Sequence, residues 1–198
     1  MNVVVVGGGS WGTAFAWLLV RHGHDVTLAC RDPEQAAAIR ETGRNPRYLG
    51  GVDLSGANAS TVEEAPVADA NLVVVAVPSA SFKAVVEALP GRAPILSLTK
   101  GLDPETGERL STVVHGRPVA VLSGPNIADE VARGLPAAAV IACESMALAV
   151  QLQLAINSTA FRVYVNDDIV GVELCAAARA MTFFAASQSS TPTMSSVT

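Results

Sequence analysis

The stretch Val3-Val4-Val5-Val6-Gly7-Gly8-Gly9-Ser10-Trp11-Gly12 decides the fold of this chain. Four β-branched residues predict a buried strand, and the glycines that follow have the spacing G-x-G-x-x-G at the start of a helix. Gly7 permits a tight turn, Gly9 lets a pyrophosphate approach the backbone, and Gly12 lets helix and strand pack closely. The helix N-terminus offers free N–H groups and a partial positive charge to phosphates. A dinucleotide-binding turn is therefore predicted, and a glycine-rich turn without a ligand is the alternative.

Short apolar runs alternate with stretches of helical length and composition. Strands are predicted at Val3–Val6, Val26–Ala29, Leu72–Val77, Ile95–Leu98, Val119–Leu122, Ala137–Ala142 and Phe161–Val165. Helices are predicted at Thr13–Arg21, Pro33–Glu41, Ser81–Leu89, Glu105–Val114 and Ser145–Ile156. This alternation is typical of βαβ units. The expected fold class is α/β, a Rossmann-like doubly wound sheet that is mainly parallel.

Composition and charge argue against nucleic-acid-binding, membrane-spanning and secreted proteins. The chain has 198 residues, of which 50% are hydrophobic, and a formal net charge of −5, which argues against nucleic acid as a partner. No apolar run reaches the ~18 residues of a membrane span, and the N-terminus lacks the basic region of a signal peptide. Cys30, Cys143 and Cys175 have no paired spacing, so we expect reduced thiols and no metal site. These features predict a cytoplasmic protein.

The end of the second strand carries the residue that reads the 2′ position of the adenosine ribose. An NAD-binding protein would place an acidic residue there. This chain has Arg31, whose guanidinium can pair with a 2′-phosphate and favours NADP. Asp32 precedes Pro33 and is interpreted as the N-cap of the next helix. The alternative for Arg31 is an ordinary surface arginine.

The chain changes character near its C-terminus. Residues 1–166 form the expected Rossmann domain, and residues 167–186 form one helix, capped by Asp167 or Asp168. In residues 187–198, eight of twelve residues are Ser or Thr. Such a composition buries too little apolar surface to offset the entropy of ordering, so we expect a disordered tail there.

Seven segments carry a family resemblance in their order and spacing. They are Gly9-Ser10-Trp11-Gly12-Thr13-Ala14, Asn45-Pro46-Arg47-Tyr48-Leu49, Val77-Pro78-Ser79, Lys100-Gly101-Leu102, Ser123-Gly124-Pro125-Asn126, Asp129-Glu130-Val131-Ala132-Arg133-Gly134-Leu135-Pro136 and Asn166-Asp167-Asp168-Ile169-Val170-Gly171-Val172-Glu173-Leu174. Over residues 1 to about 174 the chain resembles the N-terminal half of bacterial NAD(P)-dependent glycerol-3-phosphate dehydrogenases.

The resemblance implies reduction of dihydroxyacetone phosphate to sn-glycerol 3-phosphate, a precursor of glycerophospholipids. NADPH is the expected hydride source, NADH is a second one, and a homodimer is an open possibility. The implied cofactor residues are Gly7, Gly9, Ser10, Trp11, Gly12, Arg31, Tyr48, Lys100 and Ala128. The implied substrate residues are Lys100, Gly124 and Asn126. Lys100 also follows a predicted parallel strand, at the edge where open α/β sheets bind ligands.

The resemblance breaks at the residue that the family uses for proton transfer. The family has a lysine in a pattern like Gly-Gly-Ala-Leu-Lys-Asn, and this chain reads Cys175-Ala176-Ala177-Ala178-Arg179-Ala180. Arg179 therefore stands at the lysine position. An arginine can stabilise an alkoxide, but it is a poor proton donor because its guanidinium holds its proton tightly at all ordinary pH values. Lys100 and Arg179 are the candidate catalytic residues, and weakened activity is expected.

Family members also continue into a helical substrate domain that clamps the substrate phosphate. On this comparison residues 167–186 are the first helix of a truncated substrate domain, and we expect that lysine at position 179 alone does not restore activity. The chain is then a glycerol-3-phosphate dehydrogenase with impaired turnover. The alternatives are a non-catalytic NADP(H)-binding fragment and another NADP-dependent dehydrogenase of the hydroxyacid type.

Overall fold

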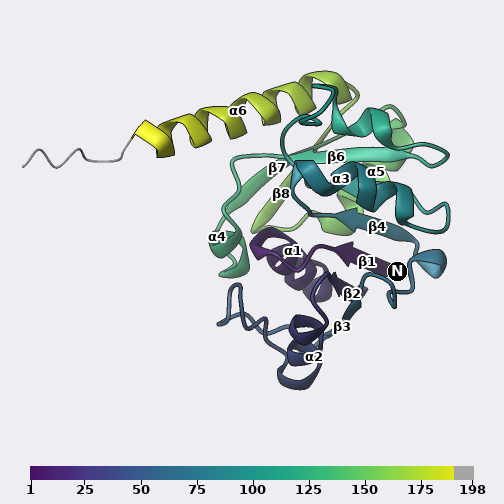
Figure 1. The fold of residues 1–198 in the computed structure, drawn as a ribbon, viewed down its shortest axis with the longest axis vertical. Coiled ribbons are helices and arrows are strands. Elements are labelled where there is room, and N and C mark those ends of the chain that lie inside the picture. Colours follow the sequence, from purple (N-terminus) through teal and green to yellow (C-terminus); the bar gives the residue numbers. More distant parts are fainter. Residues whose placement is uncertain (190–198) are drawn as a thin grey trace, which may run out of the picture.

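The computed structural model describes the backbone of residues 1–189 and the side chains of residues 1–179. Within these residues one eight-stranded sheet has the order β3-β2-β1-β4-β5-β6-β7-β8 (Figure 1). Neighbouring strands are parallel, except that β6 and β7 are antiparallel. The strands are β1 (Asn2–Val6), β2 (Asp25–Cys30), β3 (Ala57–Thr61), β4 (Leu72–Val75), β5 (Ile95–Ser97), β6 (Val119–Ser123), β7 (Ala137–Cys143) and β8 (Phe161–Asn166).

Helices cover both faces of this sheet. They are α1 (Ser10–Arg21), α2 (Pro33–Thr42), α3 (Ser79–Ala88), α4 (Ala128–Ala132), α5 (Met146–Ile156) and α6 (Ile169–Ser189), with 3-10 turns η1 (Val67–Asp69) and η2 (Leu110–Val113). In β1, Val3 and Val5 join the core under α1, α2 and α5, whereas Val4 and Val6 join the core under α3 and η2. A strand buried on both faces needs an uninterrupted apolar run, which explains the four consecutive valines.

The first six strands have the doubly wound order 3-2-1-4-5-6. In such sheets the connections leave β1 and β4 in opposite directions, and ligands bind in the crevice at the carboxyl ends of these strands. The predicted fold class, a Rossmann-like and mainly parallel α/β sheet, is confirmed.

One predicted helix is wrong. The stretch Glu105–Val114 contains a turn and the short η2 instead of a full helix. Gly107 has a φ of 72°, and Asp103 accepts hydrogen bonds from the amides of Glu105 (2.8 Å) and Thr106 (3.1 Å). A left-handed glycine and an aspartate that caps a turn both interrupt helical geometry.

One strand was not predicted, and one helix is very short. The edge strand β3 reads Ala-Asn-Ala-Ser-Thr, which has no apolar run, and it exists because it pairs with β2. Helix α4 has only five residues. Short elements of this kind depend on tertiary contacts more than on local sequence.

Helix α6 begins at Ile169 and continues to Ser189, three residues beyond its predicted end. The side chain of Asp168 accepts a hydrogen bond from the Gly171 amide at 2.8 Å, as expected of a cap. The N-terminal turns of α6 pack on β6 and β7, and its last turns project beyond the sheet (Figure 1). The disordered tail was predicted for residues 187–198, but residues 187–189 belong to α6, and residues 190–198 lie outside the described residues. Within residues 1–189, no helix has the length and apolar character needed to cross a membrane.

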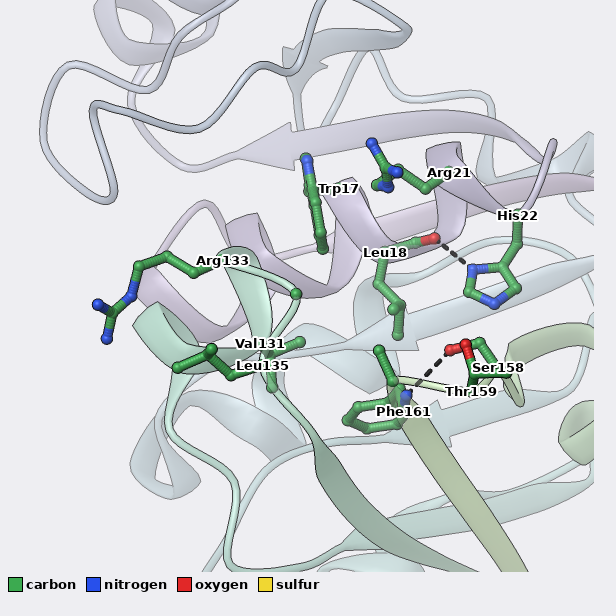
Figure 2. Close-up of a pocket in the computed structure, with 12 residues that line it drawn as sticks. Trp17, Leu18, Arg21, His22, Val131, Arg133, Leu135, Ser158, Thr159 and Phe161 are labelled. Carbon is green, nitrogen blue, oxygen red and sulfur yellow. Dashed lines mark hydrogen bonds between the residues drawn. The ribbon is translucent and has the colours of Figure 1, made fainter.

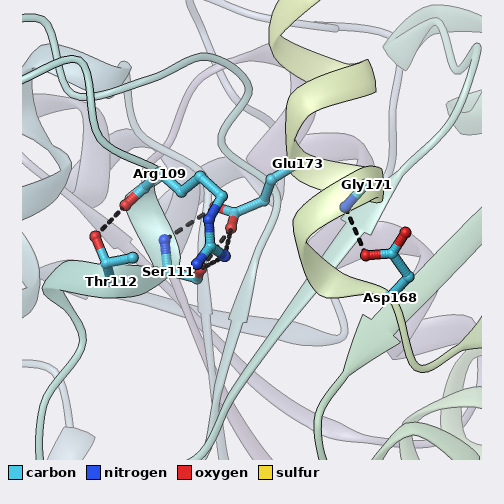
Figure 3. Close-up of polar contacts among 6 residues, drawn as sticks. All are labelled: Arg109, Ser111, Thr112, Asp168, Gly171 and Glu173. Carbon is cyan, nitrogen blue, oxygen red and sulfur yellow. Dashed lines mark hydrogen bonds and ion pairs between the residues drawn. The ribbon is translucent and has the colours of Figure 1, made fainter.

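A buried carboxylate fixes α6 to the domain. Glu173 has 7% of its surface exposed and accepts hydrogen bonds from the Ser111 amide (2.9 Å), the Ser111 hydroxyl and Arg109 Nη1 (3.2 Å) (Figure 3). Arg109 and Ser111 lie more than 60 residues away in the sequence, so this contact determines how α6 docks on η2.

We expect Glu173→Ala to lower the free energy of unfolding by about 1–3 kcal/mol, because it leaves the buried Ser111 amide and the Arg109 guanidinium without their acceptor. Urea denaturation measures the change. Glu63→Ala is the control, since Glu63 is exposed and its side chain makes no hydrogen bond among the described residues. Equal stability of the two variants would show that Glu173 does not hold α6.

Candidate active site

The glycine turn after β1 has the geometry that its sequence predicts. Gly7 has a φ of 119°, and a Cβ atom at Gly7 would collide with the Ala76 carbonyl oxygen. A Cβ atom at Gly12 would collide with the Gly7 carbonyl oxygen, so the start of α1 packs directly on the turn. At Gly9 nothing lies within 4 Å of that position. The turn is therefore packed tightly against protein atoms at Gly7 and Gly12 and is open to solvent or a ligand at Gly9.

The open side of this turn meets the N-terminus of α1. Gly9 is the N-cap residue, and no side chain caps the helix. The amides in the first turn of a helix have no partner within the helix and point along its axis. Ser10 is exposed there, and Trp11 is half-buried against Phe15, with ring centroids 6.0 Å apart. This terminus can hold a diphosphate.

The two residues after β2, Arg31 and Asp32, have different surroundings in the structure. Asp32 is the N-cap of α2, as predicted, and its Oδ1 accepts a hydrogen bond from the Glu34 amide at 2.9 Å. Asp32 also forms an ion pair with Arg47. The Glu34 amide, followed by Arg47, lowers the pKa of Asp32. Arg31 is exposed and makes no hydrogen bond or ion pair with other described residues, so its guanidinium is free to meet a ligand.

A buried side-chain amide joins the glycine turn to the loop that carries Tyr48. Asn45 is fully buried, and its Nδ2 donates to the Gly8 carbonyl oxygen (3.0 Å) and to the Thr13 hydroxyl (2.8 Å). Its Oδ1 accepts hydrogen bonds from the amides of Arg47 (3.1 Å) and Tyr48 (3.3 Å). Both ends of this amide are used, so the position of Tyr48 follows that of the turn.

Gln35 completes this buried network from α2. Its Nε2 donates to the Gly8 carbonyl oxygen at 2.7 Å and to Asn45 Oδ1 at 3.0 Å. Sequence reasoning gave neither Gln35 nor Asn45 a role. The available signal was weak: a glutamine on the buried side of a predicted helix, and an asparagine inside one of the family segments.

The carboxyl ends of β5 and β6 bring the predicted substrate residues together. Lys100 follows β5, and its Nζ donates to the Gly124 carbonyl oxygen at 3.2 Å, directly after β6. A Cβ atom at Gly124 would lie 2.5 Å from the Ala138 carbonyl oxygen and 2.7 Å from Asn126 Nδ2, so only glycine fits there. The Oδ1 atom of Asn126 is buried and has no hydrogen-bond partner. This acceptor remains available to a ligand.

Arg179 reaches the same edge from α6. Burial lowers the pKa of Lys100, and the positive charge of Arg179 lowers it further. A second positive charge close enough to lower the pKa of Lys100 favours an anion beside the two cations. Ala128, the remaining predicted contact, is the first residue of α4, two residues after Asn126. The turn at Gly124–Asn126 thus leads into a helix of only five residues.

A cavity of about 480 Å³ lies elsewhere, against the C-terminal half of α1 (Figure 2). Its walls include Trp17, His22, Leu135 and Phe161. None of the predicted cofactor or substrate residues lines it. The predicted site is instead an open edge of the sheet that extends from the glycine turn to Lys100. Among the described residues, no group of three or more His, Cys, Asp or Glu side chains could hold a metal ion.

Comparison with known proteins agrees with this geometry. Residues 2–149 match the sequence model of the N-terminus of NAD-dependent glycerol-3-phosphate dehydrogenase. A glycerol-3-phosphate dehydrogenase [NAD(P)+] of Mesorhizobium japonicum is 40% identical over 182 residues, which cover 87% of this chain and 53% of the relative. The corresponding protein of Moorella thermoacetica is 44% identical over 180 residues, which cover 87% of this chain and 54% of the relative. The chain thus spans about half the length of these curated relatives.

Solved structures give the same result for the fold. A glycerol-3-phosphate dehydrogenase from Coxiella burnetii superposes with a TM-score of 0.82 at 33% identity, over 88% of this chain and 56% of that one. A ketopantoate reductase from Ralstonia eutropha superposes with a TM-score of 0.65 at 23% identity, over 87% of this chain and 59% of that one. The second likeness shows a shared fold alone.

We expect Asn45→Leu to lower the free energy of unfolding by about 2–4 kcal/mol, because leucine has similar volume but leaves several backbone groups unpaired. Urea denaturation measures this loss. Asn58→Leu on the edge strand β3 is the control, since Asn58 is exposed, and it should change stability by less than about 0.5 kcal/mol. Wild-type stability of Asn45→Leu would show that the amide does not support the turn.

Proposed function

The chain belongs to the family of NAD-dependent glycerol-3-phosphate dehydrogenases, and on that premise we propose that it binds NADP(H) and uses it to reduce dihydroxyacetone phosphate to sn-glycerol 3-phosphate. The observation that carries this proposal is the open glycine turn at the N-terminus of α1, on the same sheet edge as Arg31 and Lys100. A diphosphate fits the free amides of α1, and the rest of the cofactor then extends along the edge in both directions.

The residues after β2, where the adenosine would lie, determine whether NADPH or NADH is preferred. Arg31 is exposed at the end of β2 and is not engaged by other described residues, so it can form charge-assisted hydrogen bonds with a 2′-phosphate. Asp32, the acidic residue next to Arg31, is occupied by the Glu34 amide and by Arg47 and is not free to accept hydrogen bonds from ribose hydroxyls. NADPH is therefore the preferred cofactor, and NADH is the second one.

The substrate end of the edge suits a small phosphorylated ketone. The cofactor supplies a hydride to the carbonyl carbon. Lys100 polarises the carbonyl oxygen, Arg179 stabilises the negative charge that develops there, and the unpartnered Asn126 oxygen can accept a hydrogen bond from a substrate hydroxyl. The alkoxide then takes a proton. Lys100 has a lowered pKa and is a better donor than Arg179, which stays charged.

We assign cofactor binding to residues 1–166 and treat α6 as the start of the substrate region, because Arg179 on α6 approaches Lys100.

The three cysteines are free thiols, of which Cys30 and Cys143 are buried, and this supports a reducing cytoplasmic setting. A different hydroxyacid-type dehydrogenase is disfavoured, since the family match covers residues 2–149.

A second candidate function rests on Arg179, which replaces the family's lysine. A chain without an effective general acid can bind NADP(H) and turn over little, because loss of such a group typically costs ~10²–10⁴ in rate. This candidate is a cofactor-binding protein that is not an active dehydrogenase. It shares the cofactor site with the first candidate and differs only in the chemical step.

We expect Arg31→Ala to raise the dissociation constant of NADPH by about 10- to 100-fold and to leave that of NADH within about threefold, because only NADPH carries the 2′-phosphate. Fluorescence titration with each cofactor measures both constants. Arg92→Ala, an exposed arginine that precedes β5, is the control and should change neither. Equal losses for the two cofactors would remove Arg31 as the residue that reads the phosphate.

Oxidation of NADPH in the presence of dihydroxyacetone phosphate separates the two candidate functions. We expect slow turnover that Lys100→Met abolishes while the melting temperature stays within a few degrees, because the ammonium acts on substrate and its one hydrogen bond among the described residues is to the Gly124 carbonyl oxygen. Lys83→Met, on the exposed side of α3, is the control. Cofactor binding without any turnover would favour the non-catalytic candidate.

A further inference from the structure

The loop that carries Asn45 also brings a second guanidinium to the end of β2. We propose that Arg47 is a specificity-determining residue for the cofactor, because it neutralises Asp32 and so leaves Arg31 free to attract a 2′-phosphate. This inference rests on the proposed binding of NADP(H) and deepens it. The role of Arg47 is indirect: it acts through Asp32.

The charge of Asp32 is a problem for a phosphate-binding site. Asp32 is adjacent in sequence to Arg31, which stands where NAD-binding proteins use an acidic residue to accept ribose hydroxyls. An uncompensated carboxylate there would attract the guanidinium of Arg31 and repel a 2′-phosphate. Because hydrogen bonding lowers the pKa of Asp32, protonation does not remove this charge near neutral pH. Another cation has to offset it.

Both oxygens of Asp32 are engaged by groups other than Arg31. Oδ1 accepts the hydrogen bond from the Glu34 amide at 2.9 Å, and Oδ2 forms the ion pair with Arg47 Nη2. Arg31, Asp32 and Arg47 together carry one net positive charge. Without Arg47 the charges of Arg31 and Asp32 would cancel, and the site would lose its attraction for an anion.

The backbone of Arg47 is anchored to a buried side chain. Its side chain is 50% exposed, but its backbone amide donates to Asn45 Oδ1 at 3.1 Å. Asn45 is fully buried and is bonded to the Gly8 carbonyl oxygen in the glycine turn. The loop that supplies Arg47 to the ion pair is therefore anchored to the same buried amide that supports the glycine turn, so its backbone keeps Arg47 near the end of β2.

A double-mutant cycle on the whole chain tests this inference. The variants are Arg47→Met, Asp32→Asn and the double variant, each titrated with NADPH and with NADH, and each checked for its melting temperature. Asparagine is as good an N-cap as aspartate, so Asp32→Asn removes the charge and keeps α2. Arg44→Met is the matched control, because Arg44 is an exposed arginine near the same loop that bonds the Gly50 carbonyl oxygen instead of Asp32.

We expect Arg47→Met to raise the dissociation constant of NADPH about tenfold and to leave that of NADH within about twofold. In the Asp32→Asn background the same substitution should cost less than about threefold, since no charge is left to neutralise. Arg44→Met should change neither constant. Equal weakening of both cofactors, no effect of Arg47→Met, or the same effect in both backgrounds would each overturn the role given to Arg47. If the wild-type chain bound no NADPH at all, the proposed function itself would fail.

Discussion

The candidate site depends on one buried amide, that of Asn45. It satisfies the Gly8 carbonyl oxygen on one side and the backbone of residues 47 and 48 on the other, and so joins two loops that are separated by about forty residues of sequence. A buried polar group of this kind is costly unless every partner is present, and when they are all present it specifies a single arrangement. Tyr48, Arg47 and the glycine turn are therefore positioned as one unit.

The second organising feature is the distribution of charge. The chain carries a net charge of −5, yet Arg31, Arg47, Lys100 and Arg179 all lie along the carboxyl edge of the sheet. Positive charge concentrated on one edge of an acidic protein attracts small phosphorylated molecules without favouring polyanions elsewhere. The edge thus offers groups that suit phosphate after β2, at the glycine turn and after β5, where the proposed adenosine, diphosphate and substrate sites lie.

Sequence alone predicted the parts that local physics determines. The valine run, the glycine turn and the Asp32 cap each follow from neighbouring residues, and all were found where expected. The failures are non-local. Residues 105–114 do not form a helix, because Gly107 breaks the stretch and Ser111 bonds Glu173 far along the chain. The pair Arg47–Asp32 likewise requires a loop to fold back on β2, which no local pattern encodes.

The reversal of direction between β6 and β7 has a consequence for the position of Arg179. Because β7 and β8 are antiparallel to the first six strands, β8 ends at the edge opposite the site, and α6 has to run back across the sheet. From Ile169 to Arg179 the helix rises about 15 Å, close to the length of a five-residue strand. Because Glu173 fixes α6 to the domain, the number of residues between Glu173 and Arg179 determines where Arg179 lies. One residue added or removed between Glu173 and Arg179 would turn residue 179 by about 100° around the helix axis and change where its positive charge lies relative to Lys100.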